Sequence, residues 1–217
     1  PIYFFRWGAA WTWATGLVLL YVVYWHGSLS MGESVGNLMF DAGTNVTGLT
    51  HLMILITFVS VFAYDYLYNS GLIKDVRVMT IVTFILIAGI IYLMKFYGGF
   101  SYRAFNIHLG ALFGTNMAFN VWFRIWPAQQ SIITSIKNGE APDGNLAALA
   151  GLRSKHNTYM SVPLIWTMMN QHTTVFAGGN FGVTESTNWL VLLIMIALGW
   201  HLVFQLYKKS ARDRKSV

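Results

Sequence analysis

The sequence predicts an all-α integral membrane protein, a bundle of about six transmembrane helices with both termini in the cytoplasm. Three observations predict this fold. Hydrophobic residues make up 55% of the 217 residues and charged residues only 10%, whereas soluble domains carry roughly 25% charged residues. Six apolar stretches approach the roughly 20 residues that a span needs. The basic residues gather in alternate connecting segments, as the positive-inside rule requires.

The six predicted spans form a single membrane domain that covers residues 1–217, with boundaries good to about 2–4 residues. They comprise residues 7–25, 49–68, 78–94, 104–123, 157–175 and 188–207. The main inner loop is residues 127–156. Within this loop, Pro127 suits the first turn of a helix and Asn138 with Gly139 suits its end, so a short interfacial helix is predicted there.

The distribution of basic residues orients the spans. With the N-terminus in the cytoplasm, every Lys and Arg except Lys95 and Arg103 falls on the inner side, which is 12 of the 14. The reverse orientation would place those 12 residues outside, against the positive-inside rule. The bias therefore predicts a multi-pass protein with its N- and C-termini on the cytoplasmic side.

Composition also excludes several classes of function. The net charge of +6 does not indicate nucleic-acid binding, because the basic residues lie between apolar runs rather than on one polar face. The chain has no cysteine, which excludes a c-type haem, a Cys-ligated iron–sulfur cluster and disulfides within it. No Ser–His–Asp arrangement, phosphate loop or carboxylate pair is visible. Membrane lipid is the partner that composition alone indicates.

The histidines are the first candidates for chemistry, because ionisable residues within spans are costly. His26, His51, His108 and His172 fall in the outer half of the predicted membrane. A b-type haem needs two imidazoles on facing helices, one on each side of the iron. His108 and His172 have the best matched depths, so they are the predicted metal ligands of haem b, with Met168 along the ring edge.

His51 is a further candidate for binding a cofactor. The alternative is that these histidines hydrogen-bond between helices, in which case a quinone or a pigment is the other class of cofactor to consider. Gly110 and Gly114 form a GxxxG motif, which predicts close helix packing. Asn116 and Asn120 lie one turn apart and predict interhelical hydrogen bonds.

Asp65 falls near the inner end of the second span among Tyr64, Tyr66 and Tyr68. Tyrosines are enriched at membrane–water interfaces, so this cluster predicts an aromatic belt with an interfacial carboxylate. Pro163 lies within the fifth span and predicts a kink there, because proline removes a backbone hydrogen bond of the helix.

Three stretches resemble the membrane domain of bacterial membrane-bound, cytochrome c-linked urate hydroxylases, the urate oxidase N-terminal domain family. They are residues 5–16, 102–130 and 153–172. Their order and spacing match the family, and the resemblance covers nearly the whole chain. It implies a domain of the bacterial cytoplasmic membrane that works with cytochrome c. The family pattern falls on Asn120, Pro127, Gln129, His156, Asn157, Tyr159 and Pro163, as well as on His108 and His172.

The c-type cytochrome domain that follows in full-length urate enzymes has no counterpart among these residues. The leading interpretation is a membrane electron-transfer subunit that holds haem b near the outer face and passes electrons to a cytochrome c. The alternative is a non-catalytic subunit of a larger respiratory or photosynthetic membrane complex. A small-solute transporter is disfavoured, because no internal repeat and few intramembrane charges are present. The sequence leaves open whether the chain is an enzyme.

Overall fold

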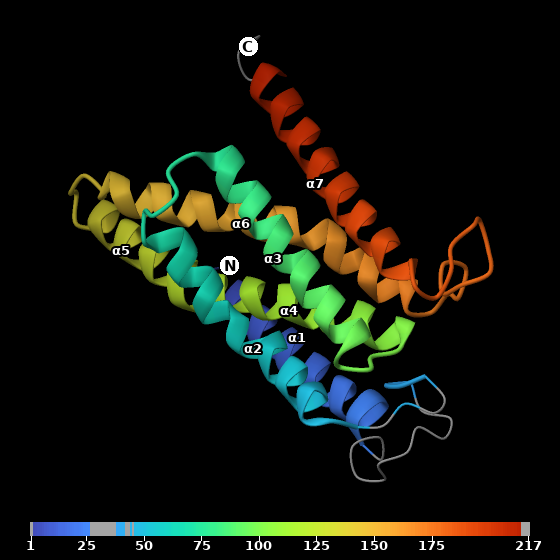
Figure 1. The fold of residues 1–217 in the computed structure, drawn as a ribbon. Coiled ribbons are helices and arrows are strands. Elements are labelled where there is room, and N and C mark those ends of the chain that lie inside the picture. The colour runs from blue at the N-terminus through green and yellow to red at the C-terminus, as the bar shows by residue number, and fades with distance from the viewer. Residues whose placement is uncertain (1, 27–37, 42–43, 45, 214–217) are drawn as a thin grey trace.

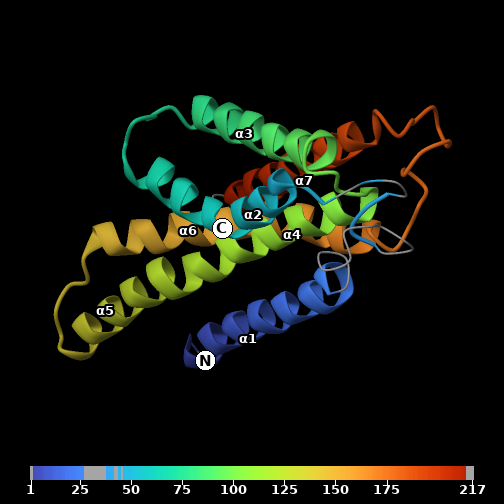
Figure 2. The same ribbon diagram turned by 60° about the horizontal axis from the view of Figure 1, so that its bottom comes forward.

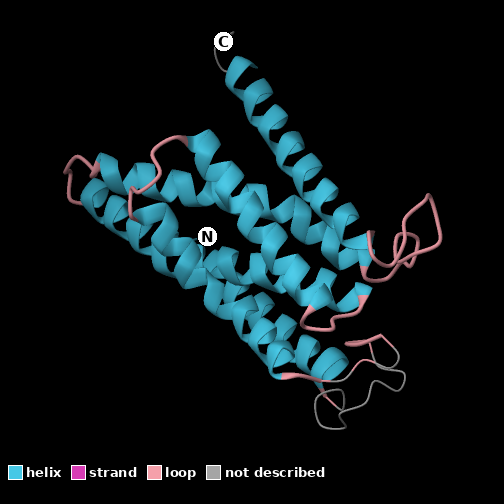
Figure 3. Ribbon diagram, in the orientation of Figure 1, coloured by secondary structure: helices cyan, strands magenta, loops and turns pink. Residues whose placement is uncertain are grey.

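The computed structural model describes residues 2–26, 38–41, 44 and 46–213. These residues are almost entirely helical (Figure 3). The β-type backbone pairing among them is one isolated antiparallel bridge between Phe40 and Phe100. The described chain forms six continuous helical rods. They are α1 with the π-helical turn η1 (Ile2–Leu20, Tyr21–Trp25), α2 (Gly48–Asn69), α3 (Val76–Phe96), α4 with η2 and α5 (Tyr102–Phe119, Asn120–Ile125, Trp126–Lys137), α6 (Gly144–Asn170) and α7 (Asn188–Asp213).

Successive rods run back and forth through the bundle. The loops that join α2 to α3 and α5 to α6 lie on the left of Figure 1, and those that join α3 to α4 and α6 to α7 lie on the right. We call the left side the basic end; α6 begins there and α2 ends there. Helix α4 contacts α1, α2, α3, α6 and α7, so it is the centre of the bundle (Figure 2).

Each predicted span lies wholly or mostly on a helix, and the fifth span departs furthest from its helix. The fifth helix begins at Gly144 rather than near residue 157, and it ends at Asn170 rather than near residue 175. The predicted inner loop 127–156 is therefore mostly helical. The short helix predicted within that loop is confirmed as α5, which is capped by Asn138 and followed by Gly139 with a φ of +76°.

Four of the described helices are long and apolar enough to cross a membrane. They are Tyr3–Trp25, Gly48–Asn69, Val76–Phe96 and Asn188–Arg212. This finding rests on length and composition, and it supports a membrane protein. Helices α4 and α6 carry too many polar residues to meet the same criterion. Their passage through the membrane and the cytoplasmic position of both termini stay predictions.

Local sequence sets where these helices begin. Thr47 and Thr50 form a capping box at the start of α2, in which each side chain takes up a backbone N–H that the first helical turn leaves free. Asp75 caps α3 and Asp143 caps α6 in a similar way. Ser101 accepts from the Ala104 N–H at the start of α4 and donates to the Leu38 carbonyl, with an Oγ–O distance of 2.6 Å.

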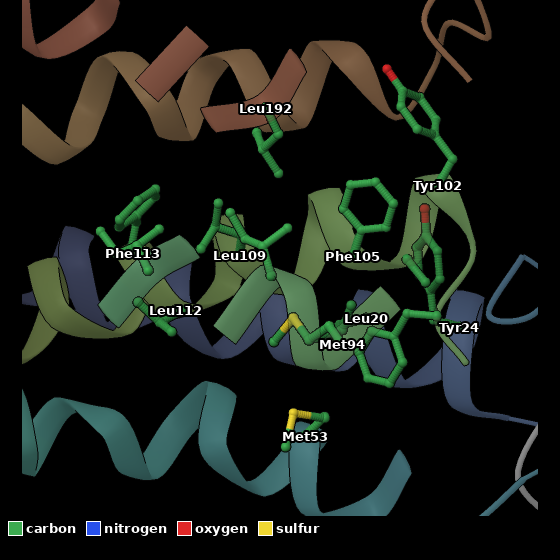
Figure 4. Close-up of a cluster of buried hydrophobic side chains, with 14 of the residues drawn as sticks. Leu20, Tyr24, Met53, Met94, Tyr102, Phe105, Leu109, Leu112, Phe113 and Leu192 are labelled. Carbon is green, nitrogen blue, oxygen red and sulfur yellow. The ribbon is translucent and has the colours of Figure 1, made fainter. Parts of the chain in front are cut away.

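The apolar core surrounds α4 (Figure 4). Phe105, Leu109 and Phe113 are fully or almost fully buried, and they pack against buried residues of the neighbouring helices, namely Leu20, Met53, Met94 and Leu192. A Cβ placed on Gly110 would lie 2.5 Å from Thr167 Oγ1 of α6. The prediction of close packing is confirmed at Gly110, because glycine lets α4 and α6 approach this closely.

Candidate functional site

Two segments of π-helix widen the rods where buried polar side chains gather. The first, η1, ends at Trp25, whose indole reaches His108, and the second, η2, begins at Asn120 and contains Arg124. Such wide turns occur mostly as single insertions within α-helices and are frequent at functional sites. Both segments therefore mark places where the bundle arranges polar side chains rather than simple apolar packing.

An ion cluster lies toward the basic end of the bundle. Asp65 of α2 accepts hydrogen bonds from Arg124 through both carboxylate oxygens, with an Nε–Oδ1 distance of 2.9 Å. Arg153 of α6 is fully buried, and its Nη2 donates to Asp65 Oδ1 at 2.9 Å and to Asn69 Oδ1 at 2.7 Å. One carboxylate thus faces two guanidinium groups, which leaves the cluster with a net charge of +1.

The interfacial depth predicted for Asp65 stays a prediction, but the carboxylate is buried and paired with two arginines rather than exposed among tyrosines. The physical reason is the high cost of moving an unpaired charge out of water. Two nitrogens of Arg153, Nε and Nη1, are buried with no hydrogen-bond partner among the described residues. The Arg153 guanidinium lies 5.2 Å from the centre of the Tyr64 ring, which offers it a cation–π contact.

A hydrogen-bonded chain runs from the ion cluster toward α4. The Asn120 amide donates to the Tyr64 hydroxyl at 2.9 Å and to Asn157 Oδ1 at 2.8 Å. The Tyr64 hydroxyl lies 2.8 Å from Nδ1 of His156. Because this hydroxyl already accepts from Asn120, its own hydrogen is available for His156. Asn157 also donates to the Met117 carbonyl at 3.2 Å, so the chain links α2, α4 and α6.

We call these residues together the polar network. It comprises Tyr64, Asp65, Asn69, Asn120, Arg124, Arg153, His156 and Asn157. Three residues singled out by the family resemblance, namely Asn120, His156 and Asn157, are therefore brought together. The prediction of interhelical hydrogen bonds is confirmed for Asn120. It is not met at Asn116, whose Oδ1 is buried without a partner among the described residues.

His108 lies in a separate, closed environment nearer the other end of α4. Its ring is fully buried, and Nδ1 lies 2.8 Å from the Ala104 carbonyl. The Trp25 indole N–H donates to Nε2 at 2.9 Å. The Phe100 ring lies 4.7 Å from the imidazole, measured between ring centres. Both ring nitrogens of His108 are therefore engaged by groups of this chain.

His172 lies beyond the end of α6, in the turn that follows Gln171, and it is exposed. A bis-histidine haem needs one free nitrogen from each ring. The described arrangement does not fit that requirement, because His108 has no free nitrogen and His172 points from an exposed turn. Haem b stays a prediction. No group of three metal-ligating His, Asp or Glu side chains gathers among the described residues.

The other candidates are dispersed. His51 is exposed in the first turn of α2, and Gln129 is half-buried on α5. Tyr159 stacks on Tyr207 of α7, with 6.1 Å between ring centres and 18° between ring planes. Met168 lies on α6, where it lines an open groove. Met168 and Tyr159 thus line different cavities, and His51 and Gln129 line neither.

That groove opens between α1, α4 and α6 and has a volume of about 790 Å³. Small residues form its walls, with Gly8, Thr12 and Gly16 on α1 and Gly110, Gly114 and Ala118 on α4. A Cβ on Gly8, Gly16 or Gly114 would meet nothing within 4 Å. The predicted close packing is therefore wrong at Gly114, which faces the open groove instead of another helix.

The polar network meets this groove at Asn157, one of the residues that line it. An amide carries two N–H donors, and one of those of Asn157 goes to the Met117 carbonyl. The other N–H is available to a ligand.

The sequence did not predict that four residues form buried contacts, namely Asp65, Arg124, Arg153 and Trp25. The available signal was that Asp65 is the single carboxylate within the predicted spans, and such a charge requires a basic partner.

These features define a helical membrane-type bundle with a polar centre and an apolar periphery. The model of one family, described as urate oxidase N-terminal, matches residues 1–217, which is the whole chain. The chain therefore belongs to the urate oxidase N-terminal family, and the resemblance seen in the sequence is confirmed. Neither a curated protein nor a solved structure matches it.

Proposed function

We propose that this chain is the membrane domain of a urate-hydroxylase-type electron-transfer system and that it passes electrons toward a cytochrome c. The family match over the whole chain supports the class of system. The four apolar helices support its place in a membrane. The cytochrome c is a partner and not a part of these residues, because attachment of a c-type haem requires cysteine and the chain has none.

One observation carries the mechanism: the groove between α1, α4 and α6 ends on a polar network buried within the bundle. Its volume of about 790 Å³ lies within the range of cofactor sites, about 300–1,000 Å³. Such sites are mostly apolar, with a few polar groups that fix orientation. We assign the groove to a carrier of the quinone class, whose apolar body lies along the small residues of α1 and α4.

Asn157 fixes the carrier in this proposal. Its available N–H donates to a carbonyl oxygen of the ring, while Asn120 holds the Asn157 side chain in place from behind. Hydrogen bonds in a chain polarise one another in a low-dielectric interior, so the bond that Asn157 Oδ1 accepts from Asn120 strengthens this donor. The cationic cluster of Arg124, Arg153 and Asp65 adds a positive potential that favours a carrier gaining electrons.

The experiment measures urate-dependent reduction of cytochrome c in membranes that contain the chain with its natural partners. Gly114→Leu extends an apolar side chain into the groove, because a Cβ at this position has open space around it. We expect it to lower the rate at least tenfold while the protein still folds. Gly89→Leu is the matched control, since Gly89 is also open and lies exposed on α3.

Equal rates for both variants would remove the groove from the mechanism. The absence of any urate-dependent reduction in the native membranes would overturn the proposed class of system. These two outcomes are distinguishable, because the first leaves the activity of the unmodified protein in place.

A second function is favoured by one observation, the complete engagement of His108. Its nitrogens bond to Ala104 and Trp25, so this buried histidine acts as a packing residue. That is expected of a non-catalytic subunit of a respiratory or photosynthetic complex. A reduced-minus-oxidised spectrum of the purified native assembly distinguishes the two functions. Haem bands that disappear in His108→Ala would argue for haem ligation, and bands unchanged by that variant would assign the haem to a partner.

A further inference from the structure

Helices α6 and α7 touch closely at one point and then separate. A Cβ on Gly199 of α7 would lie 3.1 Å from Val162 and 3.3 Å from Pro163 of α6. From this crossing toward its C-terminal end, α7 leans away from the rest of the bundle (Figure 1). The two helices thus open a wedge at the basic end, on the side of α6 that faces α7.

A cavity of about 460 Å³ occupies this wedge, lined by Lys155 and Tyr159 of α6 and by Phe204, Tyr207 and Lys208 of α7. Aromatic rings form its floor. Tyr159 and Tyr207 stack at 6.1 Å between ring centres, and the Tyr207 hydroxyl donates to Thr158 Oγ1 at 3.2 Å. These contacts hold the floor in place between the two helices.

The charge at the rim is entirely positive. Lys155 Nζ lies 5.5 Å from the centre of the Tyr207 ring, and Lys208 stands on the opposite wall. Both lysines are exposed, and neither forms an ion pair with another described residue. No carboxylate lines the cavity. This differs from the polar network, where Asp65 offsets part of the charge of two arginines.

We propose that this cavity binds one anionic phospholipid. Its phosphate lies between the ammonium groups of Lys155 and Lys208, and its first acyl segment packs on Phe204, whose side chain is 52% exposed. Basic pockets between membrane helices on the cytoplasmic side are a recognised setting for anionic headgroups. Tyrosine at the membrane interface presents an apolar ring and a polar hydroxyl to the same lipid.

Two features favour a lipid over a free phosphate ion. The lining is predominantly aromatic and alkyl, and a small hydrophilic anion gains nothing from Phe204 or from the stacked tyrosine rings. The cavity also lies near the end of a helix that is apolar enough to cross a membrane, Asn188–Arg212, where headgroups meet water. The lipid would fill the wedge that α7 opens, and so fix the angle of this helix.

The test is native mass spectrometry of the detergent-purified full chain with added phosphatidylglycerol or phosphatidylcholine. We expect one tightly retained phosphatidylglycerol and at least tenfold weaker retention of phosphatidylcholine. Lys155→Ala and Lys208→Ala should each weaken phosphatidylglycerol binding about fivefold, the size expected for one lysine at an anionic surface. Lys137→Ala is the matched control, an exposed lysine at the end of α5 that does not line the cavity.

Three outcomes would overturn the proposal. The first is equal retention of the two lipids, and the second is unchanged binding in the double variant Lys155→Ala/Lys208→Ala. The third is displacement of phosphatidylglycerol by millimolar inorganic phosphate, which would define a free-anion site. Because both lysines are exposed, the variants should fold, and an unchanged circular dichroism spectrum verifies this. None of these results depends on urate or on electron transfer.

Discussion

Helices α3 and α4 are neighbours of similar length, yet α3 buries four residues, all of them apolar, whereas α4 buries many more and several of those are polar. Helix α3 meets the criterion for a membrane span, and it exposes large apolar side chains such as Ile81 and Ile85. Helix α4 is too polar to meet it, yet eleven of its residues are buried, among them Asn106, His108 and Asn116. The bundle thus holds its polar side chains inside, among an apolar core, and exposes further apolar side chains at its periphery.

This contrast shows what hydropathy measures in such a chain. A strongly apolar helix lies at the periphery, where lipid replaces water as the surrounding solvent. A more polar helix is stable in the centre, where other helices satisfy its hydrogen bonds. The helices that composition identifies least well are therefore the ones that carry the candidate chemistry. The predictions below test this contrast in order of expected effect.

The largest effect is expected at Asp65. Asp65→Ala leaves two guanidinium groups without their shared carboxylate, and breaking a buried pair in this way costs about 3–5 kcal/mol. The midpoint and slope of denaturant unfolding in detergent would measure it. Asp75→Ala is the control, because Asp75 only caps α3 and loss of a cap costs about 1 kcal/mol. Equal losses for the two variants would show that the ion cluster is not a central contact.

The next effect is expected at Gly110. In Gly110→Ala the new Cβ would lie 2.5 Å from Thr167 Oγ1, so α4 and α6 must move apart. Overpacking of this kind costs about 1–3 kcal/mol. Gly114→Ala, one turn away, has open space and should be neutral or slightly stabilising, because alanine favours helix. Denaturant unfolding of both variants under the same conditions compares their stabilities. A Gly110→Ala protein as stable as the unmodified one would contradict the close approach of α4 and α6.

A smaller effect is expected at Trp25. Trp25→Phe keeps an aromatic ring but removes the N–H that reaches His108 Nε2. A buried acceptor left unpaired costs about 1–3 kcal/mol, and a neutral hydrogen bond of this kind falls toward the lower end. Thermal unfolding would detect the loss. Restoration of stability by the second change His108→Phe would confirm that the unpaired nitrogen is the cause.

The smallest effect is expected on the exposed side of α3. Ile85 is 61% exposed, so Ile85→Ala removes few contacts within the protein. Surface substitutions of this kind usually stay within about 0.5 kcal/mol. A loss as large as that of Gly110→Ala would mean that another subunit covers this face.

Much of the fold was predictable because it depends on local features of the sequence, such as apolar runs and turn residues. Apolar runs located every rod, and Pro127 with Gly139 located α5 to within a residue or two. The start of α6 was missed because its first three turns, from Gly144 to Lys155, are polar or mixed, and a search for apolar runs does not detect them.

The candidate site was less predictable because it depends on two things together. One is how deep each residue lies in the bundle, and the other is how its helix is rotated about its own axis. The depth of His108 and His172 suggested a pair, but depth does not say which way a side chain points. His108 faces Trp25 within the bundle, while α6 ends before it reaches His172. Asp65 was found by sequence, but its pairing with Arg124 and Arg153 depends on contacts between three separate helices.

The most direct test of the central claim asks whether α6 crosses the membrane in spite of its polar residues. The chain has no cysteine, so single cysteines at Glu140, between α5 and α6, and at Phe181, between α6 and α7, can be labelled in intact cells with a membrane-impermeant maleimide. The account predicts that Phe181→Cys labels from outside and that Glu140→Cys labels only after the membrane is permeabilised. Labelling of both from outside would contradict it, because α6 would then not cross.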